Sequence, residues 1–196
     1  MDVRVSDDNL SNVKKDSVNR YTVEDIQNLP EGQRAEIING RWYDMATPTR
    51  QHQGIVMSLS VALYDHIKEK GGDCKVYPAP FAVFLNKDNR NYFEPDISVI
   101  CDHSKLSDRG CEGAPDLVVE VTSESTKSRD LFLKLNKYKD AGVREYWVVD
   151  PLTDTVNVYE FDEKYETGGD LHIYTFDDVA AFIIFPDLKV RIADFV

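Results

Sequence analysis

The sequence contains few cysteines, no long apolar run and no signal peptide. Its three cysteines, Cys74, Cys101 and Cys111, are odd in number and lack the CxxC spacing of zinc sites, so we expect neither a disulfide framework nor bound zinc. No stretch approaches the roughly 20 apolar residues that cross a bilayer. Residues 1–20 lack the apolar core of a signal peptide. A reducing cytoplasm is therefore the simplest compartment, and we expect no membrane partner.

Positive charge is also scarce. The chain has 23 Lys and Arg residues against 35 Asp and Glu residues, which gives a formal net charge of −12. A protein that binds nucleic acid through a broad basic surface needs the opposite balance. The composition disfavours non-specific nucleic-acid binding as a function. It is compatible with a local basic cleft, or with a metal ion that brings positive charge to a phosphate.

The chain length allows one sizeable α/β core. At 196 residues the chain is too short for two comfortable domains. Residues 1–20 are polar and aperiodic, so we predict a flexible N-terminal segment at 1–20 followed by a single domain at 21–196. No internal repeat is present, and the acidic stretch at 161–170 is typical of a solvated hairpin loop.

Local patterns predict a hairpin and two helices. Asn39-Gly40 lies between two runs of strand-forming residues, which is the strongest short hairpin signal. Apolar residues recur every three or four positions across 51–70, and Gly71-Gly72 follows as a helix stop. The helical period returns across 128–142, with Ser128 as the expected N-cap.

Short β-rich runs account for most of the remaining sequence. They lie at 74–85, 94–100, 116–122, 145–150, 155–161, 171–176 and 182–192. We expect the first three to be consecutive strands of one sheet, and the last three to form an antiparallel extension. The strand, helix and strand from 116 to 150 suit a right-handed crossover, which makes the two strands parallel neighbours. The predicted fold class is therefore α/β (α+β), with a mixed central sheet flanked by helices.

Glu120 is an acid inside a valine-rich run. Strand alternation places it on the same face as Asp116, Val118 and Thr122, opposite the face of its apolar neighbours. Burying an unpaired carboxylate costs several kcal/mol, so Glu120 either reaches water or holds a cation. On this segment alone, a half-exposed strand with a solvated glutamate is an equal alternative.

Two Pro-Asp pairs precede Glu120 and compete as its partner. Asp116 is four residues from Glu120 on one strand, roughly 13 Å away at roughly 3.3 Å per residue. One Mg²⁺ with oxygens at about 2.1 Å cannot bind both carboxylates. Asp96 opens a different strand and would face Glu120 across the sheet if the two strands are neighbours. The alternative for Asp96 is an ordinary strand-start aspartate after proline.

A metal nuclease also needs a cation near the attacking water. Two residues after Glu120 the sequence has Thr122 in place of a lysine. The following helix offers Lys134, which lies about 60° from Leu131 on a helical wheel and so faces the sheet. A lysine whose stem packs while its ammonium reaches solvent is the alternative.

Together these segments resemble a known family. The stretches EIINGRWYDM, EPDISVI, APDLVVEVTSEST and GVREYWVVDP, the helix opening at His52 and the spacing from Lys134 to Tyr138 are similar to the Uma2, or DUF820, family of restriction-endonuclease-like proteins. The resemblance implies the PD-(D/E)xK nuclease fold, with Asp96 and Glu120 as metal carboxylates. It also implies that Lys134 supplies the lysine from the helix. Glu36 and His52 match family positions to which we assign no role.

The leading hypothesis is a Mg²⁺- or Mn²⁺-dependent DNA endonuclease that hydrolyses phosphodiester bonds. Asp96, Glu120 and the backbone carbonyl of Val121 would hold the metal, while Lys134 would orient water and offset the developing charge. The alternative is a non-catalytic binding or regulatory module, which the acidic composition favours. A third hypothesis, an oligomeric scaffold with solvated acids, explains Asp96, Glu120 and Lys134 less well together. By analogy of fold, a homodimer is also expected.

Overall fold

The computed structural model describes residues 21–85, 88–124, 129–161 and 169–196. The predicted flexible segment 1–20, the expected N-cap Ser128 and most of the acidic stretch at 161–170 lie outside these residues. In the described part of the chain, no helix is long and apolar enough to cross a membrane.

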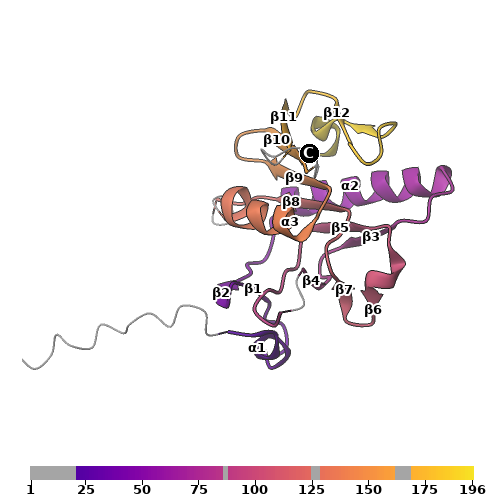
Figure 1. Ribbon diagram of the computed structural model, residues 1–196. Helices are drawn as coiled ribbons and strands as arrows, with labels where there is room; N and C mark the ends of the chain where they lie inside the picture. The colour runs from indigo at the N-terminus through magenta and orange to yellow at the C-terminus, as the bar shows by residue number, and fades with distance from the viewer. Residues whose placement is uncertain (1–20, 86–87, 125–128, 162–168) are drawn as a thin grey trace, which may run out of the picture.

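A mixed six-stranded sheet forms the centre of the fold (Figure 1). Its order is β11 (Asp170–Thr175), β10 (Thr155–Glu160), β9 (Glu145–Asp150), β8 (Leu117–Val121), β5 (Ile97–Ile100) and β3 (Lys75–Pro78). The β8 and β9 strands are parallel, and every other neighbouring pair in this sheet is antiparallel. The predicted mixed sheet and its parallel crossover are therefore confirmed.

The two main helices cover opposite faces of this sheet. The long helix α2 (Arg50–Glu69) packs its apolar stripe against a face that includes Leu117, Val119 and Val121. On the other face, a wide π-helical turn (Arg129–Lys134) continues into α3 (Leu135–Ala141), which packs against Val118. The alternation predicted for β8 is thus confirmed, and it places Glu120 on the α3 side.

The predicted hairpin forms beside the central sheet. It joins β1 (Ala35–Ile38) to β2 (Arg41–Asp44), and Asn39 and Gly40 have φ of 54° and 73°. Two consecutive positive φ angles are those of a type I′ turn, which suits Asn-Gly. An antiparallel bridge from Ile37 to Tyr92 attaches the hairpin to the chain before β5, and the short α1 (Val23–Gln27) precedes it.

Two of the expected strands do not join the central sheet. The second half of the run at 74–85 forms β4 (Val83–Phe84), which pairs with β7 (Gly110–Glu112), itself paired with β6 (Leu106–Ser107). Proline residues at 78 and 80 interrupt the run, because proline lacks the N–H that a central ladder requires. Near the C-terminus, the two-residue strands β12 (Ala180–Ala181) and β13 (Lys189–Val190) pair with each other. Short 3₁₀ helices lie at His103–Lys105 and Ile192–Phe195.

A disulfide corrects the expectation drawn from the cysteine count. Cys74 and Cys101 are bonded, and Cys111 is free and buried. The antiparallel register pairs Lys75 with Ile100, so the next positions along the two strands are the two bonded cysteines. The argument for a reducing compartment from unpaired cysteines therefore no longer holds. Burial raises the pKa of the Cys111 thiol to about 11, which keeps it protonated near neutral pH.

We predict that reducing this disulfide lowers the free energy of unfolding by about 3 kcal/mol, because the bond closes a loop of intermediate length in the unfolded chain. Urea denaturation with and without dithiothreitol measures the change. The matched control is the double variant Cys74→Ser and Cys101→Ser, whose midpoint should not respond to the reductant. An unchanged wild-type midpoint after verified reduction would contradict the prediction.

Candidate active site

The candidate site lies where β5 begins and β8 ends. The antiparallel register pairs Ile97 with Val119, which sets Asp96 opposite Glu120. The predicted neighbourhood of the two strands is therefore confirmed, and the two acids come from adjacent strands.

Asp96 is fixed by two donors on one of its oxygens. Its Oδ2 accepts a hydrogen bond from the Val121 N–H at 2.8 Å and lies 3.1 Å from His52 Nε2. In the described part of the chain, Oδ1 of Asp96 has no hydrogen-bond partner, and the side chain is 16% exposed. His52, at the start of α2, therefore orients Asp96 and leaves one carboxylate oxygen available.

The second Pro-Asp pair has the same backbone role at the other end of these strands. Asp116 Oδ2 accepts the Cys101 N–H at 2.8 Å, just as Asp96 accepts the Val121 N–H. Asp116 then pairs with Arg144 at 3.3 Å near the surface. In each case the aspartate binds an N–H of the neighbouring strand, so this structural role exists independently of any chemistry.

Glu120 is buried and receives two donors on one oxygen. Its Oε1 accepts hydrogen bonds from Lys134 Nζ and from the Tyr138 hydroxyl, each at 2.8 Å. The residue is only 4% exposed, so the alternative of a solvated glutamate is wrong. Burial, and then the negative charge of Glu120, raise the pKa of Tyr138 well above its ordinary value. Tyr138 therefore stays a neutral hydroxyl donor near neutral pH.

Lys134 lies between two buried carboxylates. Its Nζ is 2.8 Å from Glu120 Oε1 and 2.8 Å from Glu36 Oε1. The lysine is 2% exposed, so the helical wheel placed it correctly and the alternative of an ammonium in solvent is wrong. It lies at the last position of the π-helical turn, a type of turn that is rare and often found at functional sites.

Glu36 connects the hairpin to this cluster. It is fully buried on β1, and its Oε1 also accepts the Glu94 N–H at 3.1 Å. The next acid, Glu94, accepts the Tyr92 hydroxyl at 2.7 Å and pairs with Arg34 at 2.6 Å. Two carboxylates, Glu36 and Glu120, therefore share one ammonium. This leaves the cluster with one formal negative charge.

The donor set for a cation is small. In the described residues, no group of three or more His, Cys, Asp or Glu side chains is placed to hold a metal ion. A backbone oxygen is available in addition to the side chains. The Thr122 N–H binds Val149, so the Val121 carbonyl points the other way, toward β5. Pro95 lies opposite Val121 in this register and has no N–H to donate.

Comparison of the sequence with family models identifies the family of this chain. The model of the Uma2 family, described as "Putative restriction endonuclease", matches residues 23–180. The chain belongs to the Uma2 family. A protein of Synechocystis sp. called "Uncharacterized protein" is 28% identical over 128 residues, which are 65% of this chain and 66% of that protein.

The fold of this Uma2 protein is shared with a solved structure. That structure is titled as a "putative nuclease belonging to DUF820" from Anabaena variabilis. It superposes with a TM-score of 0.69 and 20% sequence identity, covering 89% of this chain and 96% of the other. The restriction-endonuclease-like architecture expected from the sequence is therefore confirmed.

In this Uma2 chain, the predicted site residues form two connected groups. Glu36, Glu120 and Lys134 make one ion-paired group, and Asp96 and His52 make the other. The Val121 N–H joins the second group to the strand that carries Glu120. Sequence reasoning missed the Tyr138 hydroxyl and the Glu36–Lys134 pair. The sequence did contain a signal for Tyr138. It is a tyrosine on the sheet-facing stripe of a helix, and a buried tyrosine hydroxyl needs a hydrogen-bond partner.

Proposed function

We propose that this protein is a nuclease that hydrolyses DNA phosphodiester bonds with the help of Mg²⁺ or Mn²⁺. One observation carries the proposal: Lys134, buried at the end of the π-helical turn before α3, contacts Glu120, and Glu120 lies opposite Asp96 on the neighbouring strand. The family description and the shared fold support a nuclease as the general class. The metal, the DNA substrate and the role of each residue belong to the proposal.

The residues present fit a hard divalent cation. Mg²⁺ keeps several waters and takes few protein oxygens, typically one or two carboxylates. Asp96 Oδ1, the Glu120 carboxylate and the Val121 carbonyl form such a set, with His52 holding Asp96 in place. When bound, the metal would act as a Lewis acid on the phosphate and lower the pKa of a bound water.

The other residues would act on charge and orientation. The Lys134 ammonium would orient the attacking water and offset the negative charge that develops on the phosphate. Glu36 would keep Lys134 in position, because it binds the same Nζ as Glu120 does. Tyr138 would hold Glu120 through its hydroxyl and stay protonated while it does so.

A non-catalytic binding or regulatory module is the second candidate. Lys134 already neutralises part of the charge on the two buried acids, so both acids have a cationic partner within the chain. The net charge of −12 also disfavours a long nucleic-acid footprint. In this case Glu36, Lys134 and Glu120 would only fix the hairpin and α3 to the sheet.

Calorimetric titration of Mn²⁺ separates the two candidates. We expect wild-type protein to bind Mn²⁺ and the Glu120→Gln variant to bind it at least about tenfold more weakly, because the variant loses a charged ligand. The amide of Gln keeps an oxygen to accept from Tyr138, so the fold should persist. The matched control is Asp116→Asn, which changes an acid on the same strand face that lies too far away to share the ion.

Either opposite result would count against the proposal. Equal binding by wild type and Glu120→Gln would place the metal elsewhere, and no binding by either would favour the non-catalytic module. The predicted homodimer, the cytoplasmic location and the flexible segment 1–20 stay predictions from the sequence.

A further inference from the structure

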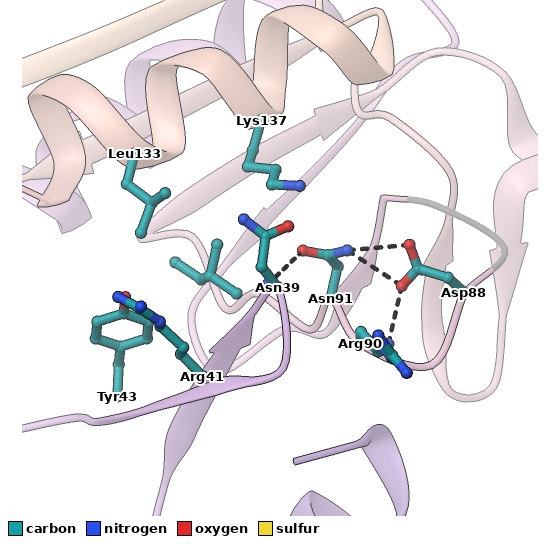
Figure 2. A pocket seen from close by; sticks show the side chains of 9 residues that line it. Asn39, Arg41, Tyr43, Asp88, Arg90, Asn91, Leu133 and Lys137 are labelled. Carbon is teal, nitrogen blue, oxygen red and sulfur yellow. Dashed lines mark hydrogen bonds between the residues drawn. The ribbon is translucent and has the colours of Figure 1, made fainter. Parts of the chain in front are cut away.

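A polar pocket lies beside the candidate active site. Its volume is about 410 Å³. It is lined by Ile38, Asn39, Arg41, Tyr43, Asp88, Arg90, Asn91, Leu133 and Lys137. Figure 2 shows Lys137 reaching down from α3 toward Asn39 and Asn91, with Arg41 and Tyr43 on one side and Asp88 and Arg90 on the other.

The pocket is cationic on an acidic protein. Arg41, Arg90 and Lys137 line it against a single acid, Asp88, although the whole chain carries a net charge of −12. Within the described part of the chain, none of these three cations forms an ion pair. Three cations from three separate segments therefore line one pocket with a single acid, and none of them is ion-paired with it.

Hydrogen bonds hold the walls of the pocket in place. Asn91 is 3% exposed, accepts the Asn39 N–H at 3.1 Å and donates to both oxygens of Asp88. Asp88 also accepts the Arg90 N–H at 2.8 Å, and the Arg90 carbonyl accepts the Gly40 N–H at 2.9 Å. Because Asp88 accepts three hydrogen bonds from two donor groups, its carboxylate organises the loop that carries Arg90, and the backbone around the cations is preorganised.

The pocket shares its walls with the buried acid cluster. Lys137 lies one helical turn after Lys134, and residues three apart on a helix are neighbours on its surface. Ile38 lies two residues after Glu36 on β1, on the same side of that strand. The pocket therefore lies next to the elements that hold Glu36 and Lys134, on the side of the hairpin and the helix that faces outward.

We propose that this pocket binds a backbone phosphate of the nucleic acid, next to the phosphate that is cleaved. Two arginines and a lysine match phosphate oxygens, since guanidinium groups bind them through two parallel N–H donors. The site concentrates positive charge locally on a chain whose net charge is −12. The inference rests on the proposed function, because it takes the ligand to be the substrate of that site.

Binding of a short fluorescein-labelled DNA duplex in EDTA tests the pocket separately from catalysis. Lys137→Gln, Arg41→Gln and Arg90→Gln are each expected to weaken binding about tenfold in fluorescence anisotropy. Each should also lower the slope of log affinity against log salt by about 0.9, the value for one phosphate contact. The matched control is Lys139→Gln, an equal change of charge at an exposed lysine on the same helix, with no expected effect on the slope.

Three results of the binding experiments would overturn the phosphate-binding proposal. Equal weakening by Lys137→Gln and Lys139→Gln would show a general charge effect and overturn the proposal, as would unchanged slopes in all three pocket variants. Displacement of the duplex by inorganic phosphate, but not by chloride at matched ionic strength, would support a phosphate site, whereas equal displacement by the two salts would overturn it. Loss of DNA binding in the pocket variants, with binding kept by Asp96→Asn, supports the pocket even if no cleavage is ever found.

Discussion

Replacing Lys134 with methionine is expected to lower the free energy of unfolding by about 3 to 5 kcal/mol at neutral pH. The change removes the ammonium shared by Glu36 and Glu120, which are 0% and 4% exposed. Removing one member of a buried ion pair leaves an uncompensated charge and typically costs this amount. Methionine keeps a similar length and shape, so the loss reports the charge rather than a cavity. Urea denaturation measures the difference.

Two further variants make this prediction specific. Lys137→Met changes the same residue type one turn along the helix, where the ammonium lies in an open pocket, and it should cost no more than about 0.5 kcal/mol. Adding Glu36→Gln to Lys134→Met should recover part of the loss, because one buried charge is then removed. Similar costs for the two lysine variants, or no recovery in the double variant, would show that Lys134 is not held as an ion pair in solution.

The substitution Asp96→Asn is expected to reduce metal-dependent cleavage of DNA by about a thousandfold or more, since it removes a charged ligand of the proposed metal. The amide oxygen of Asn can still accept the Val121 N–H. The free energy of unfolding should therefore change by no more than about 1 kcal/mol. Single-turnover assays in Mn²⁺ measure the cleavage rate of both proteins. Urea denaturation followed by circular dichroism measures their free energies of unfolding.

Asp116→Asn is the control that the fold itself provides. It alters the other Pro-Asp pair, which accepts a backbone N–H at the same 2.8 Å distance but lies away from Lys134 and His52. We expect this variant to cleave as fast as wild type. If both variants lose activity equally, the cause is the loss of a strand-end carboxylate in general, and Asp96 has no special chemical role.

Several features of the site were predictable because they depend on local periodicity. The strand alternation around Glu120 and the helical wheel around Lys134 each need only one element, and both side chains face the interior as predicted, although Lys134 lies in a π-helical turn where the wheel assumed an α-helix. The neighbourhood of Asp96 and Glu120 needed one further assumption, the pairing of β5 with β8. These steps were enough to bring Asp96, Glu120 and Lys134 together where β5 begins and β8 ends.

The rest depends on contacts between distant segments. Glu36 meets Lys134 only because the hairpin packs beside the central sheet, and nothing in the local sequence encodes that docking. The Cys74–Cys101 disulfide follows from the register of β3 with β5, which spacing alone does not reveal. The cations of the pocket come from three separate segments, so their convergence is visible only in the folded chain.

Asp96 and Asp116 each follow a proline and each accept a backbone N–H, and this shared role affects which residues an inactive relative would keep. Selection for folding alone can retain an aspartate at 96, because the Val121 N–H needs an acceptor just as the Cys101 N–H does. A relative without the proposed nuclease activity could therefore still carry Pro-Asp at this position. A more informative sign that the proposed activity is gone is the replacement of Lys134 together with a compensating change at Glu36, because the loss of Lys134 alone leaves two buried carboxylates without their shared ammonium.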